Sequence, residues 1–200
     1  MSAKVVVFDI GGVLIDWQPH LAWLDELGTR EAVEAFMARI DFPARNLRAD
    51  GGALFADLAS ELDDAEDRRR LVEYVGNYPK TVRTRIEGSW DILGRLKASG
   101  VEVHAITNWS AETWPLGIAT HPRLGTAFGV AVVSGQERMV KPDPRIFALL
   151  CTRADLAPED CLFIDDSARN VEAARAAGMD AVQFTTPQAL QTALQERGLL

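Results

Sequence analysis

The chain has 200 residues and a formal net charge of −8; 48% of its residues are hydrophobic and 25% are charged. These values are typical of a globular protein with one ample core, or with a core and a small insert. The acidic balance and the absence of long apolar stretches argue against nucleic-acid and membrane partners, and we expect no export signal. Cys151 and Cys161 lie in apolar contexts, which predicts buried free thiols and a cytoplasmic location.

Apolar runs alternate with helical patterns at the start of the chain and again after residue 85. Strands are predicted over Val5–Phe8, Val101–Ile106, Gly129–Val133, Cys161–Ile164 and Ala181–Phe184. Helices are predicted over Trp90–Ser99, Ser110–Ala119, Pro144–Arg153, Ala168–Ala177 and Pro187–Arg197. This alternation indicates an α/β fold with a doubly wound parallel sheet, in which the carboxyl ends of the strands share one edge.

The segment from Trp17 to about Arg85 interrupts the alternation and contains no convincing strand. Pro43 and Pro79 are interpreted as breaks within it. We therefore expect a small all-helical cap, residues 17–85, inserted after the first strand of a core domain that comprises residues 1–16 and 86–200. Such a cap would cover the carboxyl end of the first strand. The helices predicted in it are His20–Leu27, Arg30–Ile40, Gly51–Leu62 and Ala65–Asn77.

The first predicted strand is followed by an acid, Asp9, and then, after Ile10, by two residues without side chains, Gly11 and Gly12. In open α/β sheets, ligands gather at the carboxyl ends of the strands. The two glycines allow a tight bend and a close approach to a ligand. Aspartate also ends strands because it favours turns, so this segment alone leaves the structural and the functional interpretation of Asp9 open.

Three later segments place polar side chains at the same predicted edge of the sheet. Taken singly, these residues have ordinary interpretations as helix caps or as a surface lysine. Together, three carboxylates would converge on a lysine, and converging carboxylates repel each other unless a cation neutralises them. A hard divalent ion such as Mg²⁺ suits Asp9 with Asp166, and a metal ion with Lys141 suits a phosphoryl group. The residues of the three segments are Thr107, Asn108, Lys141, Asp165, Asp166 and Ser167.

In this order, the four segments resemble the motifs of the haloacid dehalogenase-like hydrolase superfamily. The helical insert matches the position of that superfamily's helical cap, so the resemblance covers nearly the whole chain. The Asp-x-Gly-x-Val form of the first segment is similar to a branch known for sugar-phosphate phosphatases. The matching segments are Val5–Val13, Ile106–Asn108, Lys141–Asp143 and Asp165–Asn170.

The resemblance implies a role for each matched position. Asp9 would be the nucleophile that forms an aspartyl intermediate, and Lys141 would stabilise the nucleophile and the developing charge. Mg²⁺ would be bound by Asp9, Asp166 and the main-chain carbonyl of Gly11, with Asp165 acting directly or through water. The residues expected to bind phosphate or substrate are Thr107, Asn108, Trp109, Gly11 and Gly12. The expected supporting residues are Ser167 and Asn170, of which Asn170 would orient a ligand or a metal-bound water.

Gly11 departs from the superfamily pattern, because most of its phosphatases carry a second aspartate at this position as the general acid. A metal-independent 2-haloacid dehalogenase needs no such acid, since halide leaves without a proton, but the pair Asp165-Asp166 argues against this interpretation. A phosphatase that obtains the acid elsewhere is preferred: from His20 or Asp16, from a metal-bound water, or by using a substrate with a good leaving group. A catalytically weakened binding or regulatory protein is the third alternative.

We therefore predict a Mg²⁺-dependent phosphohydrolase, a monomer or homodimer, that acts on a small phosphorylated metabolite of the sugar-phosphate type. Trp17, Trp23 and Trp109 are candidates for an apolar wall of the site, although we expect at least two of them to pack in a core. Arg45 and Arg48 are expected to be solvated surface residues, rather than ligands for a second anionic group.

Overall fold

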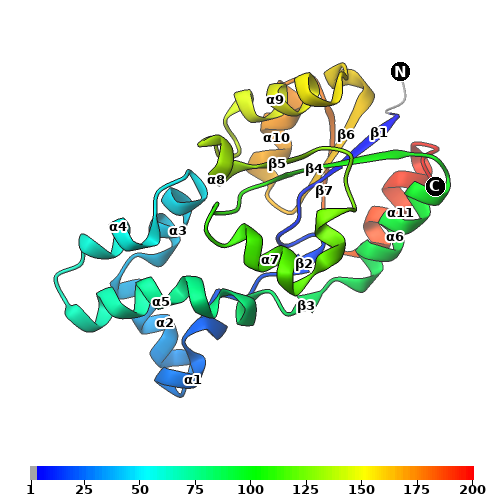
Figure 1. Ribbon diagram of the computed structural model, residues 1–200. Coiled ribbons are helices and arrows are strands. Elements are labelled where there is room, and N and C mark those ends of the chain that lie inside the picture. Colours follow the sequence, from blue (N-terminus) through cyan, green and yellow to red (C-terminus); the bar gives the residue numbers. More distant parts are fainter. Residues whose placement is uncertain (1–3) are drawn as a thin grey trace.

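Figure 1 shows the chain as a computed structural model that describes residues 4–200, so residues 1–3 of the expected core domain lie outside the described part. The strands are β1 (Val5–Phe8), β2 (Ile15–Asp16), β3 (Thr84–Arg85), β4 (Glu102–Thr107), β5 (Ala131–Val133), β6 (Cys161–Asp165) and β7 (Asp180–Gln183). The α-helices are α1 (Leu24–Leu27), α2 (Arg30–Arg39), α3 (Phe42–Asp50), α4 (Phe55–Ser60), α5 (Ala65–Thr81), α6 (Glu87–Ala98), α7 (Trp114–Thr120), α8 (Ser134–Glu137), α9 (Pro144–Ala154), α10 (Ala168–Ala176) and α11 (Pro187–Glu196). Short 3-10 helices cover Pro19–Ala22, Pro122–Gly125 and Pro158–Asp160.

Five parallel strands form a sheet with the order β5-β4-β1-β6-β7. β1 is the central strand, and its Val5 lies level with Glu102 of β4 on one side and with Cys161 of β6 on the other. The chain therefore proceeds outward in opposite directions on the two sides of β1, which makes its carboxyl end the place where ligands bind in open α/β sheets. This sheet confirms the predicted α/β fold.

Helices cover both faces of the sheet because successive side chains of β1 point to opposite sides. Val6 and Phe8 belong to one buried cluster together with Trp90 of α6. Val7 belongs to a second cluster together with Phe147 of α9. α6 and α11 thus cover one face, while α9 and α10 cover the other (Figure 1). Burial on both faces explains why β1 is apolar throughout.

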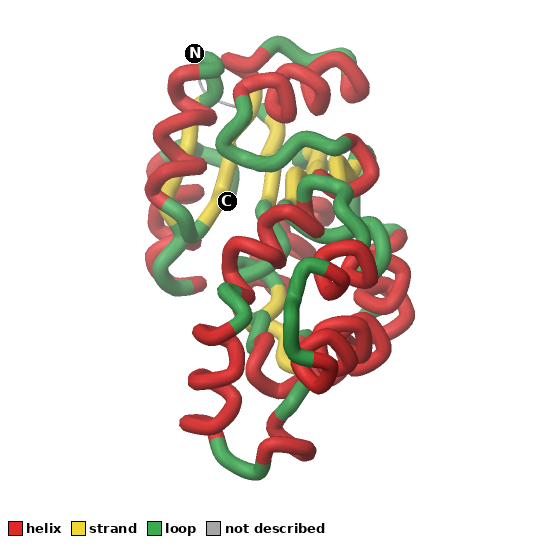
Figure 2. Tube along the Cα trace, turned by 90° about the vertical axis from the view of Figure 1, so that its left-hand side faces the viewer, coloured by secondary structure: helices red, strands yellow, loops and turns green. Residues whose placement is uncertain are grey.

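The helices between β2 and β3 lie together at one end of the molecule (Figures 1 and 2). Aromatic side chains form their core: Trp23 contacts Phe36 and Phe42 edge-on and stacks on Tyr74, with ring centroids 5.0 to 5.1 Å apart. β2 and β3 pair in antiparallel fashion where the chain enters and leaves these helices. The apolar residues of the insert continue the buried cluster on the Val6 and Phe8 face of the sheet, and a short ribbon joins the insert to the sheet.

The largest difference from the predicted elements is α3. The sequence pattern predicted a break at Pro43 and one helix over Gly51–Leu62. Instead, Pro43 lies in the first turn of α3, where a helix needs no main-chain N–H from that residue. The break falls at Gly52, whose φ of +95° disfavours any residue with a side chain. α5 likewise continues past Pro79 to its last turn.

Other differences concern the ends of elements. The helix predicted from Ser110 begins at Trp114, and the one predicted over His20–Leu27 is divided into a 3-10 turn and α1. β2 and β3 were not predicted, because two residues are too few to show an alternating pattern. Cys151 and Cys161 are buried and free, as predicted. Within residues 4–200, the helices are all too short or too polar to cross a membrane.

Candidate active site

Asp9 lies directly after β1 and is held there by three contacts. Its main-chain N–H donates to the carbonyl of Ile164 over 2.8 Å, which extends the pairing of β1 with β6 by one residue. Its Oδ1 accepts from the N–H of Ile10 at 2.7 Å, and its Oδ2 lies 2.8 Å from Nζ of Lys141. The sheet, the following residue and a buried cation therefore fix the orientation of this carboxylate.

Lys141 is fully buried and joins two carboxylates. Its Nζ lies 2.7 Å from Oδ2 of Asp165, in addition to its contact with Asp9, and it donates to the carbonyl of Ile106 over 3.1 Å. Asn108 accepts from the main-chain N–H of Lys141 at 2.8 Å and donates to its carbonyl at 3.1 Å. Asn108, expected to bind phosphate, therefore positions Lys141, and its side chain also lines the pocket described below.

The two adjacent acids at the end of β6, Asp165 and Asp166, have different surroundings. Both oxygens of the buried Asp165 accept N–H groups: Oδ1 accepts from the N–H of Ser167 at 2.8 Å, and each oxygen accepts from Nδ2 of Asn170 at 3.1 Å. Asp166 is exposed and lines the pocket together with Asp9. Asp166 is thus the member of the pair that is open to a ligand. Asn170, expected to orient a ligand or a metal-bound water, donates to Asp165.

The two glycines after Asp9 differ in the space that a side chain would have at each position. Gly12 has a φ of +75°, and a Cβ at this position would lie 2.6 Å from Oδ2 of Asp166. A side chain at Gly12 would therefore displace Asp166. A Cβ on Gly11 would meet nothing within 4 Å, and Gly11 lines the pocket. The position that lacks the superfamily's usual acid therefore opens onto the space where a ligand would bind.

Thr107 ends β4 and is almost completely buried, and its hydroxyl has no hydrogen-bond partner among residues 4–200. Buried hydroxyls are usually paired, so this one is a candidate for a bond to a bound ligand. Thr107 does not contribute to the lining of the pocket, and its contact with phosphate stays a prediction. Ser167, at the N-terminus of α10, contributes its main-chain N–H to Asp165 rather than a side-chain cap.

The charges of this cluster favour a cation. Asp9, Asp165 and Asp166 each place one oxygen within 4.8 Å of the others. The cluster holds three carboxyl groups but only one ammonium, that of Lys141, so full ionisation leaves an excess of negative charge. Burial raises the pKa of Asp9 to about 8, an effect that Lys141 opposes and Asp165 reinforces. Burial and Asp165 also raise the pKa of Asp166. An all-oxygen donor set with this charge fits a hard divalent metal ion.

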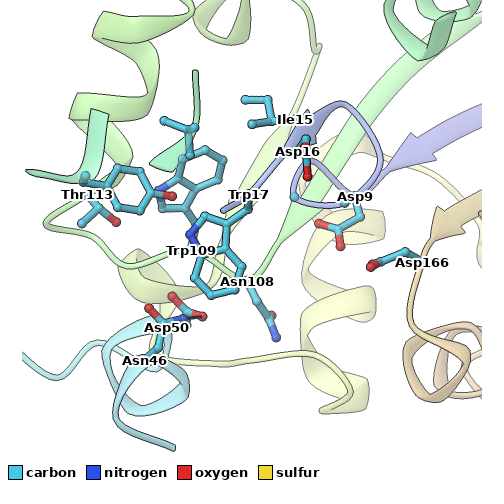
Figure 3. Close-up of a pocket in the computed structure, with 14 residues that line it drawn as sticks. Asp9, Ile15, Asp16, Trp17, Asn46, Asp50, Asn108, Trp109, Thr113 and Asp166 are labelled. Atoms are coloured by element: carbon cyan, nitrogen blue, oxygen red, sulfur yellow. Dashed lines mark hydrogen bonds between the residues drawn. The ribbon is translucent and has the colours of Figure 1, made fainter. Parts of the chain in front are cut away.

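A cavity of about 430 Å³ opens in front of Asp9 and Asp166 (Figure 3), within the size range of small-molecule sites. Both the carboxyl edge of the sheet and the helical insert contribute to its walls. Its lining residues are Asp9, Gly11, Gly12, Ile15, Asp16, Trp17, Asn46, Asp50, Tyr78, Val82, Asn108, Trp109, Thr113 and Asp166.

Asp50 and Asn46 line this pocket but were not predicted as site residues. Figure 3 shows them across the pocket from Asp9 and Asp166. Asp50 is buried, and its Oδ2 accepts from Nδ2 of Asn46 at 3.0 Å. Burial raises the pKa of Asp50 to about 7, although the N–H of Ser110 and the charge of Lys141 lower it. The signal for this pair is its i, i+4 spacing, which has meaning only once α3 is known to be a helix.

The predicted aromatic wall is formed by two of the three tryptophans. Trp17, 37% exposed, and the buried Trp109 both line the pocket. Trp23 instead packs in the core of the helical insert, where its Nε1 donates to the carbonyl of Arg70 over 2.9 Å. Two of the three, Trp23 and Trp109, are buried, in agreement with the expectation that most of them pack in a core.

Comparisons with known proteins agree with this fold. The family model of the haloacid dehalogenase-like hydrolases matches residues 3–178. A phosphoglycolate phosphatase of Nitrosospira multiformis is 33% identical over 187 residues, which are 89% of this chain and 81% of that protein. A haloacid dehalogenase family enzyme of Bacteroides thetaiotaomicron superposes with a TM-score of 0.71 at 19% identity, covering 93% of this chain and 95% of that one. The L-2-haloacid dehalogenase of Xanthobacter autotrophicus has a TM-score of 0.68 at 20% identity, covering 97% and 83%.

A parallel sheet with a helical insert, and a buried lysine among three aspartates at its carboxyl edge, define an α/β hydrolytic enzyme with an acidic centre. The chain belongs to the haloacid dehalogenase-like hydrolases, as the match over residues 3–178 shows. It is therefore a hydrolase.

Proposed function

We propose that this hydrolase is a Mg²⁺-dependent phosphohydrolase that acts on a small phosphorylated substrate through an aspartyl-phosphate intermediate on Asp9. The observation that carries the proposal is the convergence of Asp9, Asp165 and Asp166 on a fully buried Lys141 at the edge of the pocket. The phosphatases among its relatives support the same reaction.

The residues of the chain suit this reaction in three ways. Asp9 lines the pocket and lies directly after the central strand, so one of its oxygens attacks phosphorus and the leaving group departs on the opposite side. Lys141 holds Asp9 in place and balances part of the negative charge. Asp9, Asp166 and the carbonyl of Gly11 would hold Mg²⁺, which supplies positive charge to the phosphoryl oxygens when bound. Asp165 holds Lys141 from its other side.

The acidic pair also separates this proposal from dehalogenation. The chain has the fold of a solved L-2-haloacid dehalogenase, but at 20% identity that likeness concerns the fold alone. Asp165 and Asp166 place two further negative charges within 4.8 Å of Asp9. Without a metal ion they would raise the pKa of Asp9 and weaken it as a nucleophile toward an anionic haloacid. A phosphohydrolase that binds a divalent ion uses these charges.

We further propose that residues 17–85 act as a cap domain over a core of residues 1–16 and 86–200. Trp17, Asn46, Asp50 and Tyr78 of this segment line the pocket, so the segment is positioned to select the substrate. The named substrate of several relatives is phosphoglycolate, and a sugar phosphate is the class that the first motif resembles. Both are small phosphate esters that a cavity of about 430 Å³ accommodates.

Asp16 is the residue that we propose as the general acid in place of the missing one at Gly11. It lies on β2, lines the pocket, and is drawn beside Asp9 in Figure 3. Its Oδ2 accepts from Nε2 of Gln18, which fixes the side chain and leaves Oδ1 for a substrate oxygen. His20, the other candidate, does not line this pocket, and it lies in a shallow groove on the other side of Trp17.

The phosphohydrolase proposal is tested with purified protein, acetyl phosphate, p-nitrophenyl phosphate and a panel of sugar phosphates. We expect Mg²⁺-dependent release of phosphate, lost by at least about 10³-fold in Asp9→Asn because the nucleophile is removed, and lost equally on chelation. Asp143→Asn is a matched control, since Asp143 ends the lysine segment but pairs with the exposed Arg145 and does not line the pocket. Turnover that survives Asp9→Asn or chelation contradicts the mechanism, and halide release from 2-haloacids in chelator supports the dehalogenase alternative.

The role of Asp16 is tested by the dependence of the rate on the leaving group. A general acid helps a poor leaving group more than a good one, so Asp16→Asn should reduce kcat for alkyl phosphates by about 10²-fold and for p-nitrophenyl phosphate by only a few-fold. Gly11→Asp in the Asp16→Asn background should recover part of the alkyl phosphatase rate, because the space at Gly11 is open. An equal loss on both kinds of substrate would show that Asp16 is not the acid.

A further inference from the structure

Across the pocket from Asp9, the wall carries the polar side chains of Asp50 and Asn46 beside aromatic ones. None of the fourteen lining residues in the described part of the chain is lysine or arginine, whereas the insert contributes Asp50 and β2 contributes Asp16. The arginines of α3 are engaged elsewhere: Arg45 and Arg48 both pair with Glu61, at 2.8 and 2.6 Å. The pocket therefore offers no cation to a second anionic group on a substrate.

Asp50 is held in place from two directions. Its carboxylate accepts from Nδ2 of Asn46, one helical turn earlier, at 3.0 Å. Its main-chain carbonyl accepts from Oγ of Ser134 at 2.6 Å, and the same Oγ accepts from the N–H of Trp109 at 2.9 Å. Ser134 thus ties the end of α3 to the loop that follows β4. This contact sets Asp50 at a fixed place relative to the sheet edge that carries Asp9.

A purely structural role explains this arrangement poorly. Asp50 is buried, yet it forms no ion pair with a residue of the described chain, and its carboxylate lies at the C-terminal end of α3, where the helix dipole disfavours negative charge. The donors that the carboxylate does find, Nδ2 of Asn46 and the main-chain N–H of Ser110, are both neutral. Buried acids that remain without a cationic partner in a pocket are typical of functional sites. What such a carboxylate binds well is a hydroxyl or another N–H or O–H donor.

From this geometry, and resting on the phosphohydrolase proposed above, we infer that Asp50 and Asn46 form a specificity-determining pair that binds hydroxyl groups at the end of the substrate remote from phosphate. The substrate class is then a neutral, hydroxyl-bearing phosphate ester, such as a polyol or sugar phosphate. A phosphate ester that ends in a carboxylate is disfavoured, because Asp50 repels it and no cation of the pocket compensates. This separates the chain from the named substrate of its relatives, phosphoglycolate.

The test compares kcat and KM for three kinds of substrate: a polyol phosphate, 2-phosphoglycolate, and acetyl phosphate, which has neither hydroxyl nor carboxylate. Wild-type protein should prefer the polyol phosphate to 2-phosphoglycolate by at least about 10-fold in kcat/KM. Asp50→Asn should lower kcat/KM for the polyol phosphate about 10- to 100-fold, mainly through KM, while the value for acetyl phosphate changes by less than about 3-fold. Its activity on 2-phosphoglycolate should rise, and Asn46→Ala should reproduce the loss on the polyol phosphate.

Asp67→Asn is the matched control, since Asp67 is also a buried acid of the insert but pairs with Arg39 and lies outside the pocket. We expect it to leave the order of substrate preference unchanged. A wild-type preference for 2-phosphoglycolate overturns the inference, as does a parallel loss on all three substrates in Asp50→Asn. Absence of wild-type turnover of acetyl phosphate would instead refute the phosphohydrolase itself, and the inference with it.

Discussion

Burial holds the proton of Asp50 to a higher pH in the folded chain than in the unfolded one, because its pKa rises from 3.8 to about 7. A raised pKa means that the folded state binds this proton more tightly. The contribution of Asp50 to stability is therefore complete below about pH 4 and is lost as the pH rises through about 7. At neutral pH and above, the side chain that we assign to substrate selection weakens the fold.

The raised pKa of Asp50 predicts how the free energy of unfolding depends on pH. Asp50→Asn should be more stable than wild type at pH 8, by on the order of 2–4 kcal/mol, and the advantage should shrink toward zero near pH 4. Asp67→Asn should behave in the opposite way, because Arg39 lowers the pKa of Asp67 and that stabilisation is lost on acidification. Urea unfolding of both variants across this pH range provides the measurement. A constant difference between Asp50→Asn and wild type would contradict the raised pKa.

The positions of individual site residues could be predicted where the residue directly follows a recognisable strand. Asp9 and the pair Asp165-Asp166 follow apolar runs that can only be buried strands, so their shared edge follows from the parallel topology. Lys141 lies outside any strand, and its position shortly after the predicted strand Gly129–Val133 was the signal for it. That Asn108 would position Lys141 through two hydrogen bonds was not predictable, because the path of an irregular loop leaves no periodic signal.

At the level of elements, the strands were predicted best and the helical insert least well. β1 is recognisable because four consecutive buried residues produce a continuous apolar run. α3 was missed because Pro43 was taken as a break, although proline is favoured in a first helical turn. That one error concealed Asn46 and Asp50, whose i, i+4 relation exists only on a helix. The two site residues that the sequence did not reveal, Asn46 and Asp50, are thus those on α3, the helix that was not predicted.

Two tryptophans of the insert, Trp17 and Trp23, have different surroundings although the sequence offered both as candidates for the wall of the site. Trp23 is buried against Phe36, Phe42 and Tyr74, so Trp23→Ala should lower the free energy of unfolding by about 3–5 kcal/mol. Trp17 is partly exposed and lines the pocket, so Trp17→Ala should cost less than about 1 kcal/mol but should raise KM. Denaturant unfolding together with kinetics checks both. Equal losses of stability would show that the core of the insert is not organised around Trp23.

Across the whole molecule, the carboxyl edge of the sheet and the helical insert each contribute residues to the pocket. The sheet edge presents Asp9 and Asp166, and the insert presents Trp17, Asn46 and Asp50 on the other side (Figure 3). Lys141 and Asp165 lie behind Asp9, in contact with each other. Ser134 links the two parts through hydrogen bonds to Asp50 and Trp109. Chemistry would thus be determined by the sheet edge and substrate choice by the insert.

The most direct test of the central claim is the location of the phosphoryl group during turnover. Protein that turns over acetyl phosphate with Mg²⁺ is quenched in acid, digested and sequenced by mass spectrometry. We predict a phosphoryl group on Asp9, absent in Asp9→Asn and absent when the metal is chelated. Steady turnover by wild-type protein with no phosphoryl group on Asp9, or with one on another residue, would contradict the account.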